Sequence, residues 1–404
     1  MSSDLNQKLK ELDDGDIIKI KSKEYIFKLS HYKKNPIVRP QDIGLTWYEN
    51  KKKKIGAVFN PGAEIYKDKI ILLPRCHKGY KRSRYFDQKL GIKRYCLENY
   101  ISEIWPLISS DGVKFKRLRN VVIRGDGTDH PDFAYGIEDT RIVNFGHRYL
   151  LIGCGKIKPP FRGGNSDRIA IYSTKDFIKI EYHGMVKYFD SRNVIPFFVD
   201  KKTYLLLRFH PNIHLTKLSA GVDQLLDPQK YRRRWQKLYK ERHKGLLFRA
   251  REFLHEKEKI GPSTQLIKTK KGLLFLYHAV GEIDIKIARE YGLKRKIERG
   301  YSICAALLDI ENPKRVIART QHPIYIPSMP YESKGNNKFA IDVPNVVFPV
   351  GTISIDNKLL VYCGAGDKYI TLLSCNLDNL VDFLFKYCTK NCSGRSQFVL
   401  KFSC

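Results

Sequence analysis

The chain has 404 residues, of which 74 are Lys or Arg and 42 are Asp or Glu, so its formal net charge is +32. Hydrophobic residues make up 42%, which is enough for a packed core, and no apolar run is long enough to span a membrane. The composition therefore argues against a disordered chain and against a helical membrane protein. A positive field of this size attracts nucleic acid, anionic lipid or a phosphorylated substrate.

The first segment, residues 1–34, reads as an N-terminal extension. It has neither an apolar stretch nor a cleavage-type ending, so we expect a cytoplasmic protein without a secretory signal. The nine cysteines are odd in number and scattered, which favours reduced thiols over a disulfide framework. The Cys388 to Cys392 spacing lacks a second pair or a nearby histidine, so we expect free thiols and no metal.

Five segments along the chain share a polar turn followed by a short apolar strand, and a strand-like run precedes each of them. Each unit predicts a β-hairpin, and the missing helical crossovers argue against an α/β fold. We therefore predict an all-β, five-bladed β-propeller that forms a single domain over residues 1–404. The five segments are YKDKIILLPR (66–75), FGHRYLLIGC (145–154), VDKKTYLLLRF (199–209), TKKGLLFLYH (269–278) and IDNKLLVYCG (355–364).

Residues 223–259 interrupt the hairpins with a dense run of basic and apolar residues at roughly helical spacing. This run predicts a basic helical insertion, and residues 376–404 form a C-terminal extension. Elsewhere the lysines lie at turns and strand edges, so their distribution does not favour nucleic-acid binding. The sequence leaves a homo-oligomer open, with the insertion as one contact surface.

If the five hairpins are equivalent, the polar residues near the ends of their strands converge on one mouth of a central channel. A polar mouth built from several units is what a pocket for a polar ligand requires. These residues are Asn60, Arg75, Glu138, Asp139, Arg141, Arg192, Asn193, Arg208, Gln265, His278, Asn345 and Asp367.

Eight motifs, in this order, resemble the landmarks of glycoside hydrolase family 130, the β-mannoside phosphorylases and β-mannosidases. They extend from about residue 35 to residue 374, and the resemblance implies a five-bladed propeller and an inverting reaction on a β-mannoside. The sequence departs from the family pattern at Thr140, where the family has proline, and in the Arg192-Asn193 and Leu207-Arg208 pairs. The motifs are VFNPGA with LLPR, SSDGVKF, GIEDTRIV, SRNVIPF, IKTKKGLLFLYHAV, YSICAALLDIENPKRVIAR, VPNVVFPVG and VYCGAGD.

The resemblance assigns roles to individual residues. Asp139 of the EDTR motif is the expected catalytic acid, with the proton passing through a substrate hydroxyl in phosphorylases of this kind. Glu138 and Arg141 are expected to hold the sugar and tune the acid, although a neighbouring carboxylate and an arginine shift its pKa in opposite directions. The expected mannose contacts also include Asn60, Arg75, Asp111 and Asp367, and for Asp111 a purely structural SDG turn is an equal alternative.

The nucleophile is either phosphate, which needs several cationic donors, or water, which needs a carboxylate base. Glu64 and Glu332 are the candidate bases for the hydrolytic alternative. The sequence offers more residues for phosphate than for a base, and we expect a phosphorylase. The expected phosphate-binding residues are Arg168, Arg192, Asn193, Arg208, His210, Lys268 and His278.

The leading hypothesis is thus an inverting β-mannoside phosphorylase that acts on β-1,2-mannooligosaccharides and releases or uses α-mannose 1-phosphate. Its partners are the mannooligosaccharide and phosphate or mannose 1-phosphate, with no cofactor. The alternatives are an inverting β-mannosidase, a β-mannosyltransferase that uses a nucleotide sugar such as GDP-mannose, and a noncatalytic propeller that binds carbohydrate or a polyanion.

Overall fold

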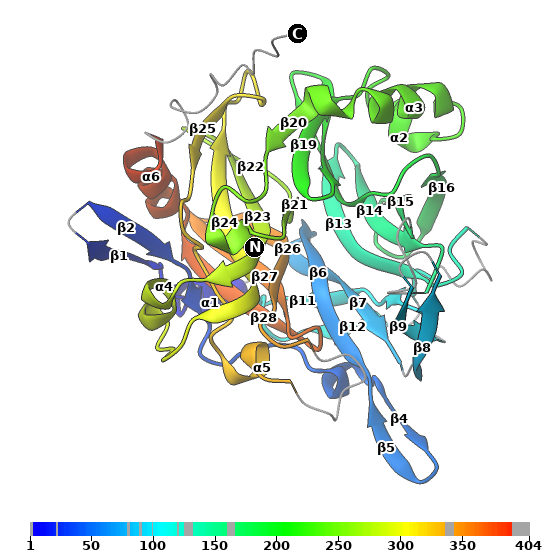
Figure 1. Cartoon of the computed structure of the whole chain (residues 1–404), viewed down its shortest axis with the longest axis horizontal. Helices are drawn as coiled ribbons and strands as arrows, with labels where there is room; N and C mark the ends of the chain where they lie inside the picture. The colour runs from blue at the N-terminus through cyan, green and yellow to red at the C-terminus, as the bar shows by residue number, and fades with distance from the viewer. Residues whose placement is uncertain are drawn as a thin grey trace.

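A computed structural model describes residues 3–21, 23–78, 81–88, 91–98, 100–118, 121–124, 132–159, 166–335 and 343–389. Within these ranges the protein consists mostly of antiparallel β-sheets with few helices (Figure 1). The predicted all-β class is confirmed. No sheet among the described strands closes on itself, and the five-bladed propeller stays a prediction.

Five sheets of four or five strands follow one another along the described chain, and each contains one of the predicted hairpins. The first sheet contains β6 (Ala57–Tyr66), β7 (Lys69–His77), β10 (Glu103–Ile104), β11 (Leu107–Ser109) and β12 (Lys116–Arg117). The second contains β13 (Ile137–Phe145), β14 (Arg148–Lys156), β15 (Asp167–Thr174) and β16 (Ile180–Val186). The third contains β17 (Arg192–Val199), β18 (Lys202–Phe209), β19 (Asn212–Lys217) and β20 (Leu246–Phe248).

The last two sheets complete the series. The fourth contains β21 (Lys259–Pro262), β22 (Ile267–Thr269), β23 (Gly272–Ile283), β24 (Ile297–Leu308) and β25 (Val316–Arg319). The fifth contains β26 (Val347–Ile355), β27 (Lys358–Ala365), β28 (Tyr369–Asn376) and β3 (Ser30–His31). The fifth sheet is therefore assembled from both ends of the chain.

Three two-stranded hairpins and several short helices surround these sheets, and the β4–β5 hairpin projects away from the body (Figure 1). The hairpin strands are β1 (Asp16–Lys21), β2 (Glu24–Lys28), β4 (Thr46–Glu49), β5 (Lys52–Ile55), β8 (Lys81–Asp87) and β9 (Ile92–Glu98). The α-helices are α1 (Ser3–Lys10), α2 (Asp223–Leu226), α3 (Arg232–Lys240), α4 (Ile285–Glu290), α5 (Pro330–Ser333) and α6 (Leu377–Tyr387). The 3-10 helices are η1 (Pro40–Ile43), η2 (Arg242–Gly245) and η3 (Leu254–Glu256).

The large hydrophobic clusters lie between consecutive sheets. Ile71 of the first sheet shares a cluster with Leu151 of the second, and similar clusters join the second to the third, the third to the fourth and the fourth to the fifth. A further cluster contains Leu72 of the first sheet and Leu360 of the fifth. The first and last sheets in the chain therefore pack against each other, which brings segments far apart in sequence to one core.

The three predicted extra segments take part in the sheets or their cores. Strand β3 of the N-terminal extension pairs with β28, and the leucines of α1 enter the cluster between the first and fifth sheets. Residues 223–259 contain α2, α3, η2 and η3 but also β20, which pairs with β19 and completes the third sheet. Helix α6 of the C-terminal extension packs in the cluster between the fourth and fifth sheets, and residues 390–404 lie outside the described part.

The first strands of the first three sheets, β6, β13 and β17, share an irregularity that positions polar side chains. Asn60, Asp139 and Asn193 have φ values of 51°, 51° and 62°, and each lies where the register of β6, β13 or β17 shifts against the next strand. Asn and Asp tolerate this left-handed conformation better than other residues with a Cβ. The same bulge in three sheets therefore presents an Asn or Asp at equivalent points.

The seven cysteines in the described part, Cys76, Cys96, Cys154, Cys304, Cys363, Cys375 and Cys388, are all free and buried. Cys392 and Cys404 lie outside it. None of the helices described is both long and apolar enough to cross a membrane.

Candidate active site

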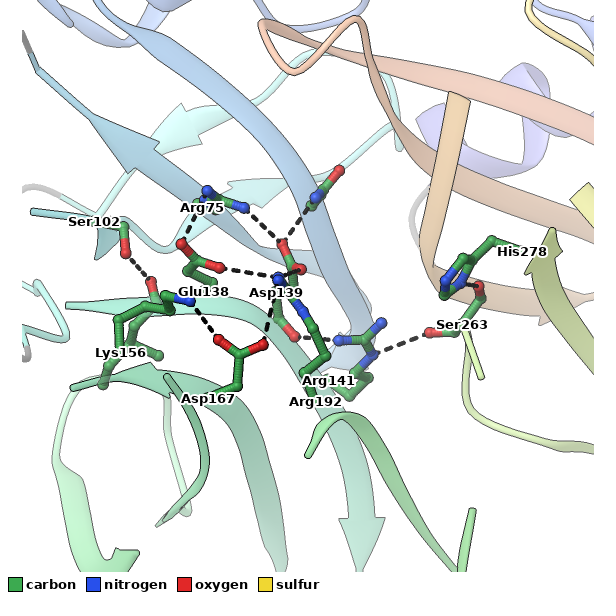
Figure 2. A network of polar contacts seen from close by, with 12 residues as sticks. Arg75, Ser102, Glu138, Asp139, Arg141, Lys156, Asp167, Arg192, Ser263 and His278 are labelled. Carbon is green, nitrogen blue, oxygen red and sulfur yellow. Dashed lines mark hydrogen bonds and ion pairs between the residues drawn. The ribbon is translucent and has the colours of Figure 1, made fainter. Parts of the chain in front are cut away.

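Two adjacent carboxylates on β13 form the centre of a buried ion cluster. Arg75 Nη2 lies 3.0 Å from Glu138 Oε1, and Arg75 Nη1 lies 3.5 Å from Asp139 Oδ1. Arg192 Nη2 lies 2.9 Å from Glu138 Oε2 and 2.8 Å from Asp139 Oδ2 (Figure 2). Glu138 and Asp139 are each only 2% exposed. Guanidinium groups from the first and third sheets thus compensate two carboxylates of the second sheet.

Neutral side chains complete the contacts of this carboxylate pair. Asn60 Nδ2 donates a hydrogen bond of 2.8 Å to Asp139 Oδ1. Tyr100 donates from its hydroxyl to Glu138 Oε1 at 3.1 Å and also contacts Arg75. The left-handed bulges at residues 60 and 139 bring the first of these pairs together, so the backbone irregularity has a direct role in building the cluster.

A third carboxylate lies beside the pair. Asp167 at the start of β15 forms an ion pair with Lys156 of β14, and its Oδ2 lies 3.7 Å from Arg192 Nη1. Burial by itself raises the pKa of Asp167, but Arg192 and Lys156 outweigh burial and hold the pKa well below its usual range. Arg192 therefore lies between three carboxylates.

The sequence left open whether the pKa of Asp139 is raised by Glu138 or lowered by Arg141, and in the structure it is lowered. Burial raises the pKa of Asp139, but Arg192, Arg75 and Arg141 together lower it far below its usual range. Arg141 donates from Nη1 to the Asp139 carbonyl oxygen at 2.6 Å and from Nε to the Ser263 carbonyl oxygen at 3.1 Å. In the absence of substrate, the arginines dominate and Asp139 is ionised.

The opposite side of the cluster is cationic and has unused hydrogen-bonding groups. Arg208 of β18 lies opposite Arg192 in the strand register, and it forms no ion pair with any carboxylate in the described residues. Burial and then Arg192 lower the pKa of Arg208. A Cβ built at Gly261 would lie 2.5 Å from His278 Cε1 and 3.1 Å from Arg208 Cδ, so both side chains lie against this glycine.

Two neutral residues add to this cationic side. His278 is fully buried, with Nδ1 3.0 Å from Ser263 Oγ and with Nε2 lacking a hydrogen-bond partner among the described residues. Burial, reinforced by Arg208 and Lys259, lowers the pKa of His278 so that the imidazole is neutral. The amide nitrogen and oxygen of Asn193 likewise lack partners there. An anion bound at this point would satisfy several groups at once.

Asp367 lies in the turn between β27 and β28, with a φ of 55°. Burial raises its pKa to about 6, and the nearby Asp139 and Glu138 act in the same direction against Arg75 and Arg192. The four carboxylates around the arginines are therefore not equivalent: Asp139 and Asp167 have lowered pKa values, whereas that of Asp367 is raised.

Comparison with known proteins matches the chain to a family. The family model described as β-1,4-mannooligosaccharide phosphorylase, glycoside hydrolase family 130, matches residues 28–386. The chain belongs to glycoside hydrolase family 130. This confirms the resemblance found in the sequence motifs.

Individual family 130 proteins are similar over most of their length. A 1,2-β-oligomannan phosphorylase of Thermoanaerobacter sp. is 28% identical over 322 residues, which cover 75% of this chain and 93% of the relative. The solved β-1,2-mannobiose phosphorylase of Listeria innocua is 20% identical, with a TM-score of 0.61, and the match covers 88% of this chain and 99% of that one. A further solved structure, whose description says that family 130 contains glycoside hydrolases that target β-1,2-mannosidic linkages in Candida mannan, is 19% identical, with a TM-score of 0.58, over 87% and 95% of the two chains.

Most of the predicted site residues of this family 130 chain lie together, but two lie at the opposite ends of their sheets. Ser109 lies two residues before Asp111 and pairs with Ile70 of β7. Arg75 is five residues further along β7, so roughly 17 Å separates it from Ile70 at ~3.3 Å per residue. Asp111 Oδ1 accepts hydrogen bonds from the backbone amides of its own turn. The structure thus shows the turn arrangement that the sequence offered as the alternative for Asp111.

Lys268 lies at the end of the fourth sheet that is far from the carboxylate cluster. It pairs with Leu273, five residues before His278 on β23, and it is exposed beside a hollow that it lines together with Glu64 and Gln265. Gln265 Nε2 donates to the carbonyl oxygens of Ala63 and Thr352, so it joins the first and fifth sheets instead of entering the carboxylate cluster.

The remaining predicted cations lie at the margin of the cluster. Arg168 on β15 is 7% exposed, and its Nη1 donates to the Asp167 carbonyl oxygen at 2.9 Å. His210 follows β18, and its side chain is largely exposed. Partial loss of solvent and then the positive charge of Arg208 lower its pKa. Asn345 precedes β26 with a φ of 59°, and its carbonyl oxygen accepts a hydrogen bond from the Tyr301 amide.

Neither candidate base of the hydrolytic alternative lies with Asp139. Glu332 is fully buried and accepts hydrogen bonds from the amides of Ser328 and Met329, both at 3.0 Å, so it holds its own loop. Glu64 lines the hollow at the Lys268 end of the sheets. The pKa of each carboxyl is raised to about 7. In both residues the cause is burial of the side chain in its own surroundings, away from Asp139.

Sequence reasoning missed four residues that the structure brings to the cluster: Tyr100, Lys156, Asp167 and Ser263. Asp167 precedes the predicted Arg168, but only the pairing of β14 with β15 shows that it faces Arg192. Tyr100 precedes β10 outside every motif, so no signal marked it. In the residues described, no group of three or more His, Cys, Asp or Glu side chains is arranged to hold a metal ion.

Proposed function

We propose that this protein is an inverting β-mannoside phosphorylase that interconverts β-1,2-mannooligosaccharides and phosphate with α-mannose 1-phosphate. One observation carries the proposal: the partly buried cation Arg208 forms no ion pair with a carboxylate in the described residues and lies beside the ion-paired Asp139 cluster. An anionic co-substrate would compensate it. The family model supports a mannooligosaccharide phosphorylase, and the 1,2-β-oligomannan phosphorylase relative supports the β-1,2 linkage.

The carboxylate side of the cluster would bind the mannosyl unit. Glu138 and Asp367 offer acceptors to sugar hydroxyls, while Asn60 and Arg75 hold Asp139 in place. Asp139 would act as the acid that supplies a proton, through a substrate hydroxyl, to the leaving oxygen. Arg141 contacts the Asp139 backbone and Ser263, so in this proposal it positions the acid and does not bind the sugar.

Phosphate would bind between Arg208, Arg192, Asn193 and His278 Nε2. One phosphate oxygen attacks the anomeric carbon from the face opposite the leaving group, the glycosidic bond breaks, and the leaving oxygen receives the proton. Three arginines keep Asp139 ionised in the free protein. The negative charge of bound phosphate offsets these arginines and raises the pKa of Asp139, so that Asp139 takes up a proton from solvent when phosphate binds and can then donate it. No cofactor beyond this co-substrate is needed.

The five sheets would form the five blades of a β-propeller. The supporting observations are the series of five sheets, the hydrophobic clusters between consecutive sheets and the cluster that joins the fifth sheet to the first. The equivalent bulges at residues 60, 139 and 193 would then face one mouth of the central channel. A single such domain, cytoplasmic in location, remains our expectation.

Product analysis tests the reaction. β-1,2-Mannobiose is incubated with the protein with and without inorganic phosphate, and mannose 1-phosphate and free mannose are measured, with β-1,4-mannobiose as a parallel substrate. The proposal predicts mannose 1-phosphate that depends on phosphate and on the β-1,2 linkage. Free mannose without phosphate dependence would identify a hydrolase and overturn it, and turnover of only the β-1,4 disaccharide would overturn the linkage.

The role of Arg208 is tested by Arg208→Ala. Loss of one charge-assisted contact raises the KM for phosphate about tenfold or more, because such a contact is worth roughly 1.5 to 3 kcal/mol. Arg148→Ala is the matched control, since Arg148 lies at the far end of the second sheet and pairs with Glu181 at 3.0 Å. An unchanged KM for phosphate in Arg208→Ala would place the anion elsewhere.

A further inference from the structure

A basic hollow lies outside the carboxylate cluster, between the third sheet and the helices of the 223–259 segment. Its volume is about 330 Å³, and it is bounded by β18, β19, α3 and η2. One lining cation comes from the turn before β25 in the fourth sheet, so two neighbouring sheets contribute. The lining cations are Lys217, Arg234, Lys237, Arg242, Lys244 and Lys314.

These cations are largely uncompensated. The one carboxylate that lines the hollow is Glu241, whose Oε1 lies 3.5 Å from Lys244 Nζ. Arg234 Nη1 donates to Ser219 Oγ at 3.3 Å, and Arg242 Nη1 donates to the Tyr239 carbonyl oxygen at 3.0 Å. Apart from the Lys244 pair, no ion pair to the lining cations occurs within the described residues. Six cations beside one carboxylate create a local field that favours an anion.

The deeper part of the hollow has polar groups of a different kind. Gln224 is 1% exposed, and its Oε1 has no hydrogen-bond partner among the described residues. His214 is 7% exposed, and its Nδ1 also has no partner there. Burial lowers the pKa of His214 to about 4, so the ring is neutral at pH 7 and can accept a hydrogen bond. Unpartnered buried acceptors favour a ligand that brings hydroxyl donors.

The hollow is separate from the carboxylate cluster. Leu207 and Phe209 line it, whereas Arg208, between them on β18, lies against Gly261 and faces the cluster. Successive side chains of a strand point to opposite faces, so the two sites use opposite faces of the same strand. A ligand in the hollow can therefore contact β18 without entering the carboxylate cluster.

We propose that this hollow binds a phosphorylated sugar or polyol, with the phosphate on the cations of α3 and η2 and the hydroxyls on Gln224 Oε1 and His214 Nδ1. The proposal does not rest on the reaction proposed above. Phosphate alone would leave the buried acceptors unsatisfied, and an uncharged sugar would leave the cations uncompensated. The combination of both groups in one small molecule matches the whole lining.

Fluorescence titration of the full chain with glucose 6-phosphate tests the proposal. Trp235 on α3 follows Arg234 and is fully buried, so it is a local reporter of the hollow. The double variant Arg234→Ala/Lys237→Ala is expected to weaken binding at least about tenfold, because it removes two charge-assisted contacts. Gln224→Leu, which leaves the charge unchanged, is expected to weaken glucose 6-phosphate binding but not binding of inorganic phosphate.

The matched control is Arg233→Ala/Lys240→Ala, which removes the same charge from the same helix at positions that do not line the hollow. This control is expected to retain binding. Equal weakening by the two double variants would show that only the overall charge matters and would overturn the proposal. Inorganic phosphate or glucose binding as tightly as glucose 6-phosphate would overturn the combined recognition of phosphate and hydroxyls.

Discussion

At the scale of single residues, the stability of the cluster depends on mutual compensation of buried charges. Arg192 contacts Glu138 and Asp139 at less than 3 Å and lies near Asp167, and each of these groups would be costly to bury alone. Removal of one partner leaves the others uncompensated. Variants at this site therefore need a binding or folding readout besides turnover.

The first residue-scale prediction concerns the acid. Asp139→Asn keeps the shape of the side chain and the contact with Asn60 but cannot donate a carboxyl proton, so kcat should fall by about 10² to 10⁴, the usual contribution of general acid catalysis. The measurement is kcat on β-1,2-mannobiose together with mannobiose binding. Asp200→Asn, the same change in an exposed turn with a φ of 46°, is the control. Retained turnover in Asp139→Asn would remove this residue as the acid.

The second prediction concerns pH. Burial raises the pKa of Asp367 to about 6, so the carboxyl is ionised above pH 6 and able to accept hydrogen bonds from sugar hydroxyls. Because kcat/KM reports ionisations of the free enzyme, it should fall as pH drops through about 6. Because its pKa is raised in the folded protein, protonation of Asp367 stabilises the fold. The fall in kcat/KM therefore does not come from lost stability at Asp367. A pH profile of Asp367→Asn that keeps the same inflection would assign it to another group.

At the scale of elements, the bulged first strands determine where polar side chains point. Asn60, Asp139 and Asn193 adopt positive φ at the register shifts of three strands. In a strand without a bulge, successive side chains point to alternate faces of the sheet, and these three side chains would follow that alternation. The bulge changes the direction in which they point. The bulges therefore connect a local backbone feature to the chemistry of the cluster.

The element-scale prediction uses Asn193 on β17, whose φ is 62° and whose side chain is 2% exposed. Asn193→Ala should destabilise the protein by about 1 to 2 kcal/mol relative to Asn193→Gly, because alanine is strained in the left-handed region and glycine is not. Both variants should raise the KM for phosphate, since both remove the amide. Urea unfolding and phosphate kinetics measure the two effects. Equal stability of the Ala and Gly variants would contradict the role of the backbone.

At the scale of the whole molecule, the N-terminal segment stabilises the junction of the first and fifth sheets. Strand β3 pairs with β28, and the α1 leucines pack in the cluster shared by these sheets. The N-terminal segment should therefore contribute to global stability and not behave as an independent tail. A cooperative transition that includes it is the expected behaviour.

The whole-molecule prediction is that Leu5→Ala lowers the free energy of unfolding by about 2 to 5 kcal/mol, the usual cost of truncating a buried leucine. Leu5 is 2% exposed in this cluster. Gln7→Ala, an exposed change in the same helix, should have little effect. Urea unfolding followed by intrinsic fluorescence measures both. A stability of Leu5→Ala equal to that of Gln7→Ala would mean that α1 is not part of the cooperative unit.

The sequence by itself determined the hairpins, the all-β class, the family and the pair Glu138 and Asp139. These features are local: apolar strands alternate with polar turns, and the motifs are short runs of adjacent residues. It also indicated that Arg75, Arg192 and Arg208 would lie near the pair, because strand ends in equivalent hairpins meet at one edge.

Only the tertiary structure decided which residues complete the cluster. Asp111 and Lys268 belong to matching motifs but lie at the far ends of their sheets, while Tyr100, Lys156 and Asp167 lie in it. Strand register determines these positions, since five residues along a strand separate two side chains by roughly 17 Å at ~3.3 Å per residue. The low pKa of Asp139 likewise depends on arginines from other sheets, and no single stretch of sequence contains that arrangement.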